Sequence, residues 1–164
     1  MPLCFISIGS NINREHNISS ALSALQSEFG LLQHSSIYES DSVGFVGDAF
    51  YNLVSAFHCE ADAWDIARQL KNIEAEHGRV RSIEKFSPRT LDIDLLLYGQ
   101  QIIQTDTLTI PHQDILKYAF VLEPLVEIAA NQQHPVNNLN YAQLWSDFDK
   151  SKLQQRKIRK AHDT

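Results

Sequence analysis

The chain contains little cysteine and no long hydrophobic run. Only Cys4 and Cys59 occur among 164 residues, which excludes a disulfide framework and fits a reducing compartment. No stretch approaches the roughly 20 apolar residues that a membrane-spanning helix needs. The first residues also lack the basic and apolar pattern of a secretory leader. We therefore expect a cytoplasmic protein that has no membrane partner.

Positive charge is also scarce. The chain has 14 lysines and arginines against 20 acidic residues, for a net charge of −6, so its overall balance does not indicate a nucleic-acid partner. Hydrophobic residues make up 43% and charged residues 21%, which is ordinary for a globular protein. The length suits one domain over residues 1–164 with a sizeable core, followed from about residue 131 by a polar C-terminal region.

Hydrophobic periodicity predicts strands and helices that follow one another along the chain. The expected strands are 3–8, 31–39, 50–59 and 91–98, and the expected helices are 13–29 and 62–78. A short strand at 102–103, a helix from Asp114 to about Leu122 and a helix starting at Pro124 should follow. The order β-α-β-β-α-β predicts an α+β, ferredoxin-like sandwich with a largely antiparallel sheet and helices packed on it.

The basic segment 150–160 is expected to be a solvated or frayed tail. A membrane anchor is the alternative, but the segment offers no obvious apolar helical face.

Two aspartates give the most informative pattern in the chain. On a strand, Leu91, Ile93, Leu95 and Leu97 would share one side, and Asp92 and Asp94 would share the other, roughly 7 Å apart. Two neighbouring carboxylates repel one another, and a Mg²⁺ ion would relieve this repulsion. A solvated face with no ligand is the plain alternative.

Four of the chain's few cations precede this pair, within residues 79–89. Pro88 and the lack of periodicity predict a loop there. Arginine forks beside a metal site are typical of a bound polyanion such as a phosphate chain.

Three motifs together resemble the 6-hydroxymethyl-7,8-dihydropterin pyrophosphokinases of folate synthesis. They are Gly9-Ser10-Asn11, the string Phe86-Ser87-Pro88-Arg89-Thr90-Leu91-Asp92-Ile93-Asp94, and Ile110-Pro111-His112. The similarity runs from about residue 3 to about residue 130. It implies the same fold, a monomer, and transfer of pyrophosphate from ATP to the hydroxymethyl group of a reduced pterin with release of AMP. Two Mg²⁺ ions would assist, and such a transfer needs mainly positioning and charge stabilisation.

The resemblance also implies roles for individual residues. The metal ligands would be Asp92 and Asp94. The cations of the loop, which contact the phosphates, would be Arg79, Arg81 and Arg89. The nucleotide would lie near Glu74, Arg89, Leu95, Thr109 and His112. The pterin would be held by Ser40, Val43, Phe50, Asn52, Phe86 and Phe120, with the Asn52 amide reading the ring edge. Without the resemblance, Phe50 and Phe120 are more simply explained as core residues.

The chain departs from the family pattern at three positions. Phe86 and Lys85 stand where the family usually has Trp and Arg, and Tyr118 aligns with a family arginine. A tyrosine cannot supply a cationic fork to phosphate. A divergent paralogue acting on a related alcohol or modified pterin therefore stays open, as does a catalytically weak nucleotide- or pterin-binding protein. An unrelated nucleotidyltransferase is less favoured, because such enzymes place Gly-Ser close before Asp-x-Asp, whereas Ser10 lies far from Asp92.

Overall fold

The computed structural model describes residues 1–30, 32–41, 48–78, 91–151 and 153–161. Its elements, in chain order, are β1 (Leu3–Ser10), α1 (Arg14–Phe29), β2 (Gln33–His34), β3 (Ser36–Ser40), β4 (Phe50–His58), α2 (Ala63–Glu76), β5 (Asp92–Tyr98), β6 (Ile103–Gln104), β7 (Thr109–Ile110), α3 (Asp114–Lys117), α4 (Ala119–Ala129), α5 (Tyr141–Asp147) and β8 (Gln155–Lys160). None of the described helices is long and apolar enough to cross a membrane.

The main sheet has the strand order β5-β1-β4-β3-β8, and β2 pairs with β4. These pairings are antiparallel. The strand β1 therefore lies between β4 and β5. The helix α1 connects β1 to β2, and α2 connects β4 to β5. This arrangement confirms the predicted α+β sandwich.

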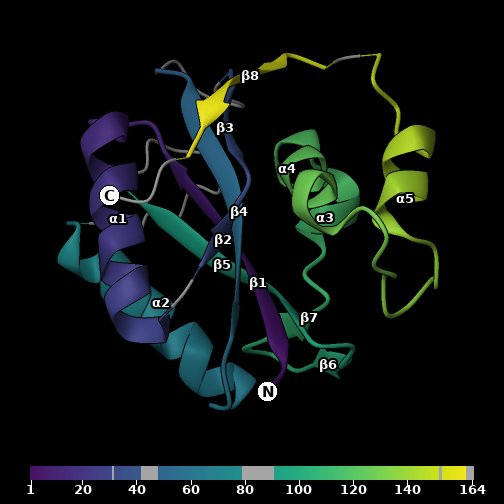
Figure 1. Ribbon diagram of the computed structural model, residues 1–164, viewed down its shortest axis with the longest axis horizontal. Helices are drawn as coiled ribbons and strands as arrows, with labels where there is room; N and C mark the ends of the chain where they lie inside the picture. Colours follow the sequence, from purple (N-terminus) through teal and green to yellow (C-terminus); the bar gives the residue numbers. More distant parts are fainter. Residues whose placement is uncertain (31, 42–47, 79–90, 152, 162–164) are drawn as a thin grey trace.

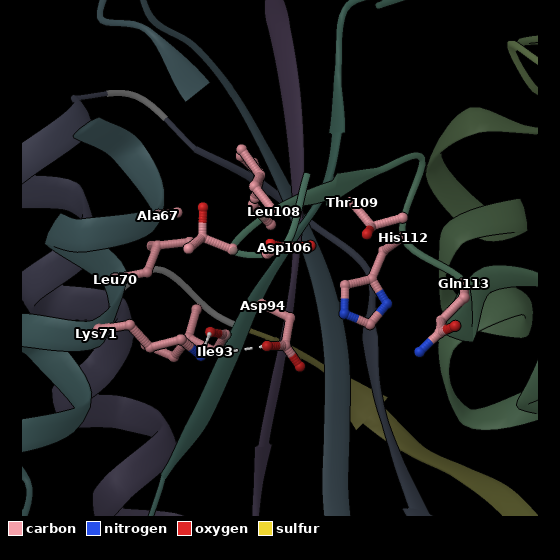
Figure 2. A pocket seen from close by; sticks show the side chains of 12 residues that line it. Ala67, Leu70, Lys71, Ile93, Asp94, Asp106, Leu108, Thr109, His112 and Gln113 are labelled. Carbon is pink, nitrogen blue, oxygen red and sulfur yellow. Dashed lines mark hydrogen bonds and ion pairs between the residues drawn. The ribbon is translucent and has the colours of Figure 1, made fainter. Parts of the chain in front are cut away.

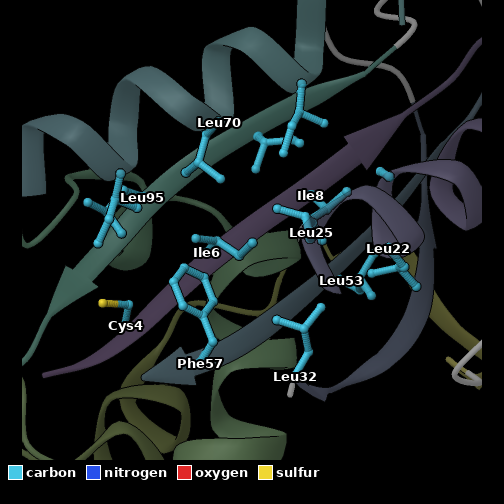
Figure 3. Close-up of a cluster of buried hydrophobic side chains, with 14 of the residues drawn as sticks. Cys4, Ile6, Ile8, Leu22, Leu25, Leu32, Leu53, Phe57, Leu70 and Leu95 are labelled. Carbon is cyan, nitrogen blue, oxygen red and sulfur yellow. The ribbon is translucent and has the colours of Figure 1, made fainter. Parts of the chain in front are cut away.

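Helices cover both faces of the sheet (Figure 1). On one face, α1 and α2 enclose a core that includes Leu25, Leu70 and the strand residues Ile6 and Leu95, as Figure 3 shows. On the other face, α3, α4 and α5 pack over a second core around Val54. Alternation along β4 produces this division, because Leu53 points to the first core and Val54 to the second.

The prediction that Leu97 shares a face with Leu95 is wrong. The register between β1 and β5 shifts between Phe5, which pairs with Leu97, and Ile6, which pairs with Leu95. Leu96 therefore has no partner residue on β1. This β-bulge turns Leu97 into the second core, while Leu95 stays in the first.

The predicted helices after Asp114 have different boundaries. α3 ends at Lys117 because Tyr118 is extended, with φ −123° and ψ 128°, and α4 then runs through Pro124 rather than beginning there. Packing outweighs the local cost of the proline, since Pro124 is buried within α4. The helix α5, which the sequence reading did not expect, begins after Asn140, whose side chain accepts the backbone N–H of Gln143 at 2.8 Å.

The prediction of a frayed tail at 150–160 is also wrong, because β8 adds a strand to the edge of β3. Ile158 packs against the first core. Arg156 pairs with Glu39 at 2.8 Å, and Arg159 pairs with Glu15 on α1. Backbone pairing with β3, the core contact of Ile158 and nearby carboxylates thus order a segment whose own sequence is too cationic to predict as a strand.

Candidate active site

The strand register brings three predicted or motif residues into one row. Gly9 on β1 lies opposite Asp92 on β5 and opposite Asn52 on β4. Residues directly opposite one another in an antiparallel sheet point to the same face. Asp92 and Asn52 therefore flank Gly9 on the face that α3 and α4 cover, and Asp94 lies opposite Ser7 two residues further along β5.

Gly9 leaves the space that this row requires. A Cβ atom at Gly9 would lie 2.8 Å from Oδ1 of Asn52, which is closer than such atoms approach. The Asn52 amide also donates from Nδ2 to Oγ of Ser40 at 3.0 Å. The absence of a side chain at residue 9 and the hydroxyl at residue 40 thus fix the orientation of the amide predicted to read the pterin.

The open edge of β5 is closed by α2. The buried Glu74 accepts the backbone N–H of Ile93 through Oε2 at 2.6 Å. Lys71 donates to the Ile93 carbonyl at 3.2 Å. These contacts satisfy the backbone groups of an edge strand that would otherwise be exposed.

Lys71 also reaches the predicted metal ligand. Its Nζ lies 3.3 Å from Oδ1 of Asp94 and 3.1 Å from Oε2 of Glu74. Burial lowers the pKa of the Lys71 ammonium, but attraction to Asp94, Glu74 and Asp92 outweighs burial and raises that pKa. Lys71 is therefore a charged counter-ion to these three carboxylates, a role that the sequence analysis did not predict.

His112 is held beside the same carboxylate. Its backbone N–H donates to the carbonyl of Leu96 at 2.9 Å, so the bulge residue of β5 anchors the Pro-His turn. Its Nδ1 accepts the backbone N–H of Asp114 at 3.1 Å. A neutral imidazole in this arrangement carries its proton on Nε2, which is then a donor.

A pocket of about 240 Å³ joins these elements along the edge of β5. Figure 2 shows Leu70 and Lys71 entering it from α2, and Thr109 and His112 from the opposite side, with Asp94 between them. Leu95 also lines it. Three of the residues predicted to contact the nucleotide, Leu95, Thr109 and His112, are thus brought together, whereas Glu74 borders the pocket through its bonds to Lys71 and Ile93.

The described residues contain one cluster of three groups that could hold a metal ion: Asp94, His112 and Asp114, whose ligand atoms lie within 4.8 Å of one another. Nδ1 of His112 is already engaged by a backbone N–H. Mg²⁺ prefers oxygen ligands and retains water. The imidazole of His112 is therefore a less suitable Mg²⁺ ligand than the carboxylate oxygens of Asp94 and Asp114.

Two of the aromatic residues predicted to hold the pterin, Phe50 and Phe120, lie at the same face of the sheet as Asn52. Phe50 precedes Asn52 by two residues on β4 and so shares its side. Phe120 packs at the margin of the second core, and its ring stacks on that of Tyr118 with centroids 4.8 Å apart. Lys117 places its Nζ 5.2 Å from the Tyr118 ring centroid. Tyr118 thus stacks on Phe120 and has the ammonium of Lys117 beside its ring.

Five predicted site residues lie outside the described part of the chain: Val43, Arg79, Arg81, Phe86 and Arg89. Lys71, Gln113 and Asp114 border the site without having been predicted. One signal could have identified Lys71: it precedes Glu74 by three residues, so the two side chains share a helical face.

Comparison with known proteins agrees with this geometry. The family model described as 7,8-dihydro-6-hydroxymethylpterin-pyrophosphokinase (HPPK) matches residues 5–130. A 2-amino-4-hydroxy-6-hydroxymethyldihydropteridine pyrophosphokinase of Haemophilus influenzae is 39% identical over 135 residues, covering 80% of this chain and 84% of that protein. The corresponding protein of Bacillus subtilis is 35% identical over 130 residues, covering 77% of each.

Two longer proteins are also similar. The folic acid synthesis protein fol1 of Pneumocystis carinii is 38% identical over 141 residues, and the match covers 84% of this chain but only 19% of that protein. The crystal structure of wild-type Plasmodium falciparum HPPK-DHPS with pteroate matches 96% of this chain and 48% of its own, with a TM-score of 0.73 and 14% identity. The family model and the bacterial relatives together show that this chain belongs to the 7,8-dihydro-6-hydroxymethylpterin-pyrophosphokinase family.

Proposed function

We propose that this protein transfers a pyrophosphoryl group from ATP to the hydroxymethyl group of 6-hydroxymethyl-7,8-dihydropterin and releases AMP, a step of folate biosynthesis. The observation that carries this proposal is the row Asp92, Gly9 and Asn52 across three strands. It sets a carboxylate suited to metal-bound phosphate beside an amide suited to a pterin edge, with only a glycine between them. A transfer between a nucleotide and a pterin needs these two neighbouring subsites.

ATP would occupy the pocket beside β5. Leu95 and Thr109 would contact the nucleoside portion with Glu74, and Nε2 of His112 would donate to a phosphate oxygen. Arg79, Arg81 and Arg89 would contribute the remaining cations around the phosphates. Asp92 and Asp94 would hold Mg²⁺, two ions by analogy with the family, which supplies charge neutralisation on the phosphate oxygens.

The pterin would lie at the other end of the row. The Asn52 amide, oriented by the Ser40 hydroxyl, would read its ring edge, and Phe50 and Phe120 would bracket its faces together with Phe86. Backbone groups at Ser40 and Val43 would add contacts. The substrate hydroxyl oxygen then bonds to the β-phosphorus while the bond from that phosphorus to the oxygen bridging it to the α-phosphorus breaks. AMP leaves with the bridging oxygen, and the hydroxyl proton passes to water.

The metal assignment is tested by Asp92→Asn and Asp94→Asn. Each change keeps the side-chain shape and removes one ligand charge, so turnover should fall by orders of magnitude while the melting temperature changes little. Asp147→Asn on the exposed surface of α5 is the matched control. Turnover equal to wild type in both variants at saturating Mg²⁺ would contradict the assignment.

We propose further that the chain forms a single domain, acts as a monomer in the cytoplasm, and uses small molecules rather than nucleic acid or membrane as partners. Two free cysteines support a reducing compartment. The paralogue that acts on a related alcohol is the second candidate, favoured by the Tyr118 and Phe120 stack where the family has an arginine. AMP release with another alcohol, but not with the dihydropterin, would select it. Ligand binding without turnover would select the weak binding protein.

A further inference from the structure

Lys71 occupies an unusual position for a lysine in a metal-dependent site. Its side chain is 36% exposed, yet Nζ contacts three acceptors: Glu74 Oε2 at 3.1 Å, the Ile93 carbonyl at 3.2 Å and Asp94 Oδ1 at 3.3 Å. An ammonium has three N–H donors and no acceptor. Each donor therefore has a partner, and the Asp94 carboxylate is neutralised by a cation that belongs to the protein itself.

A metal ion on Asp94 would meet this ammonium. Both are cations, and they would seek the same carboxylate at distances where like charges repel. The metal therefore binds fully only when Nζ moves away from Asp94.

The structure permits that movement without loosening α2. Glu74 is tied to β5 by the backbone N–H of Ile93 at 2.6 Å, a bond that does not involve Lys71. Lys71 can keep its contacts to Glu74 and Ile93 while it leaves Asp94, because its four-carbon stem is flexible and partly exposed. The side chain also lines the pocket proposed for ATP, opposite His112 (Figure 2), so an incoming phosphate chain offers new acceptors.

We propose that Lys71 is a placeholder cation: it holds the Asp94 carboxylate in the ligand-free protein and is displaced when a divalent metal binds. This inference rests on the proposed role of Asp94 as a metal ligand. Lys71 is thus a positioning residue that lowers the affinity for metal alone and favours metal that arrives together with a polyphosphate. A purely structural lysine would instead leave metal affinity unchanged on removal, or weaken it by disordering Asp94.

The test is a titration with Mn²⁺ alone, followed by the electron paramagnetic resonance signal of the unbound ion at low ionic strength. Lys71→Gln and Lys71→Met should bind Mn²⁺ more tightly than wild type, by roughly two- to fivefold, a range that fits a partly exposed ion pair. Lys71→Arg, which retains the cation, should bind like wild type.

Arg68→Gln is the matched control, because it removes a cation from an exposed site on α2 that pairs with Asp65 rather than with Asp94. It should leave Mn²⁺ affinity unchanged. Circular dichroism confirms that each variant is folded, and two different Lys71 replacements guard against the failure of one.

The outcomes separate the two proposals. If Asp94→Asn loses Mn²⁺ affinity and neither Lys71→Gln nor Lys71→Met gains it, the placeholder role is wrong while the metal ligand stands. If Asp94→Asn binds Mn²⁺ like wild type, the metal assignment is wrong, and the placeholder role falls with it. An equal gain in Arg68→Gln would also overturn the proposal, because the effect would then be general electrostatics.

Discussion

Replacing Gly9 with alanine tests the row of site residues most specifically. Gly9 has ordinary strand geometry rather than a left-handed backbone, so the substitution causes no backbone strain. The new Cβ atom would lie 2.8 Å from Oδ1 of Asn52, about 0.6 Å short of the 3.4 Å at which ordinary contact begins. The clash falls on the end of a side chain and not on the main chain, because the Tyr51 carbonyl oxygen would lie 3.7 Å away, which is an ordinary contact.

The protein should therefore stay folded, and the loss of ligand binding should be confined to the pterin. Turning the Asn52 amide aside breaks its 3.0 Å bond to Ser40 and pushes the side chain off its rotamer, which together cost about 1–2 kcal/mol of unfolding free energy. The pterin loses its edge reader, so its affinity should fall at least roughly tenfold, equivalent to about 1.4 kcal/mol. Affinity for a non-hydrolysable ATP analogue should hardly change.

Calorimetric titration of each ligand separately measures this difference, and a double-mutant cycle identifies its cause. If the clash is with Asn52, Gly9→Ala should have no further effect on pterin affinity in an Asn52→Ala background. Equal losses for pterin and nucleotide would refute the reasoning, because they would mean that the sheet itself had been distorted. Unchanged pterin affinity would place the pterin elsewhere.

Three further predictions concern His112, His134 and β8. His112→Ala should weaken binding of the ATP analogue more than His112→Gln, measured by the same titration, because only glutamine retains a donor; equal losses would argue against a phosphate contact. Burial lowers the pKa of His134 below 6.5, and its Nδ1 accepts the backbone N–H of Val136 at 3.2 Å. The contribution of neutral His134 to the unfolding free energy should be fully present above about pH 6.5 and should decrease as the pH falls, because the unfolded chain takes up the proton first. Urea titrations should show a weaker decline with pH in His134→Gln. An identical decline would contradict this contribution of His134. Ile158→Asp should lower the unfolding free energy by about 1–3 kcal/mol, since it sets an unpaired charge against the core; no change would mean that β8 is frayed in solution.

Local pattern was sufficient to predict the main elements of the fold. Alternation defined β4 and its two faces, and the N-cap at Asp62, which accepts the N–H of Asp65 at 2.8 Å, marked the start of α2. The order of these elements then limited the topology to a ferredoxin-like sheet. The edge strand β8 was missed because its pairing with β3, the packing of Ile158 and the carboxylates of Glu39 and Glu15 all involve residues far away in the sequence.

The arrangement of the site required long-range register that no local pattern contains. Periodicity placed Asp92 and Asn52 on separate strands, but only the pairing of both with Gly9 makes them neighbours. The bulge at Leu96 depends on how β1 and β5 align, and it decides where His112 is anchored. The contact between Lys71 and Asp94 likewise joins a helix and a strand whose contacting residues are 23 positions apart in the sequence.

Product analysis tests the central claim most directly. The purified protein is incubated with ATP, Mg²⁺ and 6-hydroxymethyl-7,8-dihydropterin, and the nucleotide and pterin products are separated and quantified over time. The proposed reaction predicts AMP and the pterin diphosphate in equal amounts, with both nearly abolished in Asp94→Asn. Formation of ADP, or of AMP without a pterin diphosphate, would contradict pyrophosphoryl transfer to this substrate.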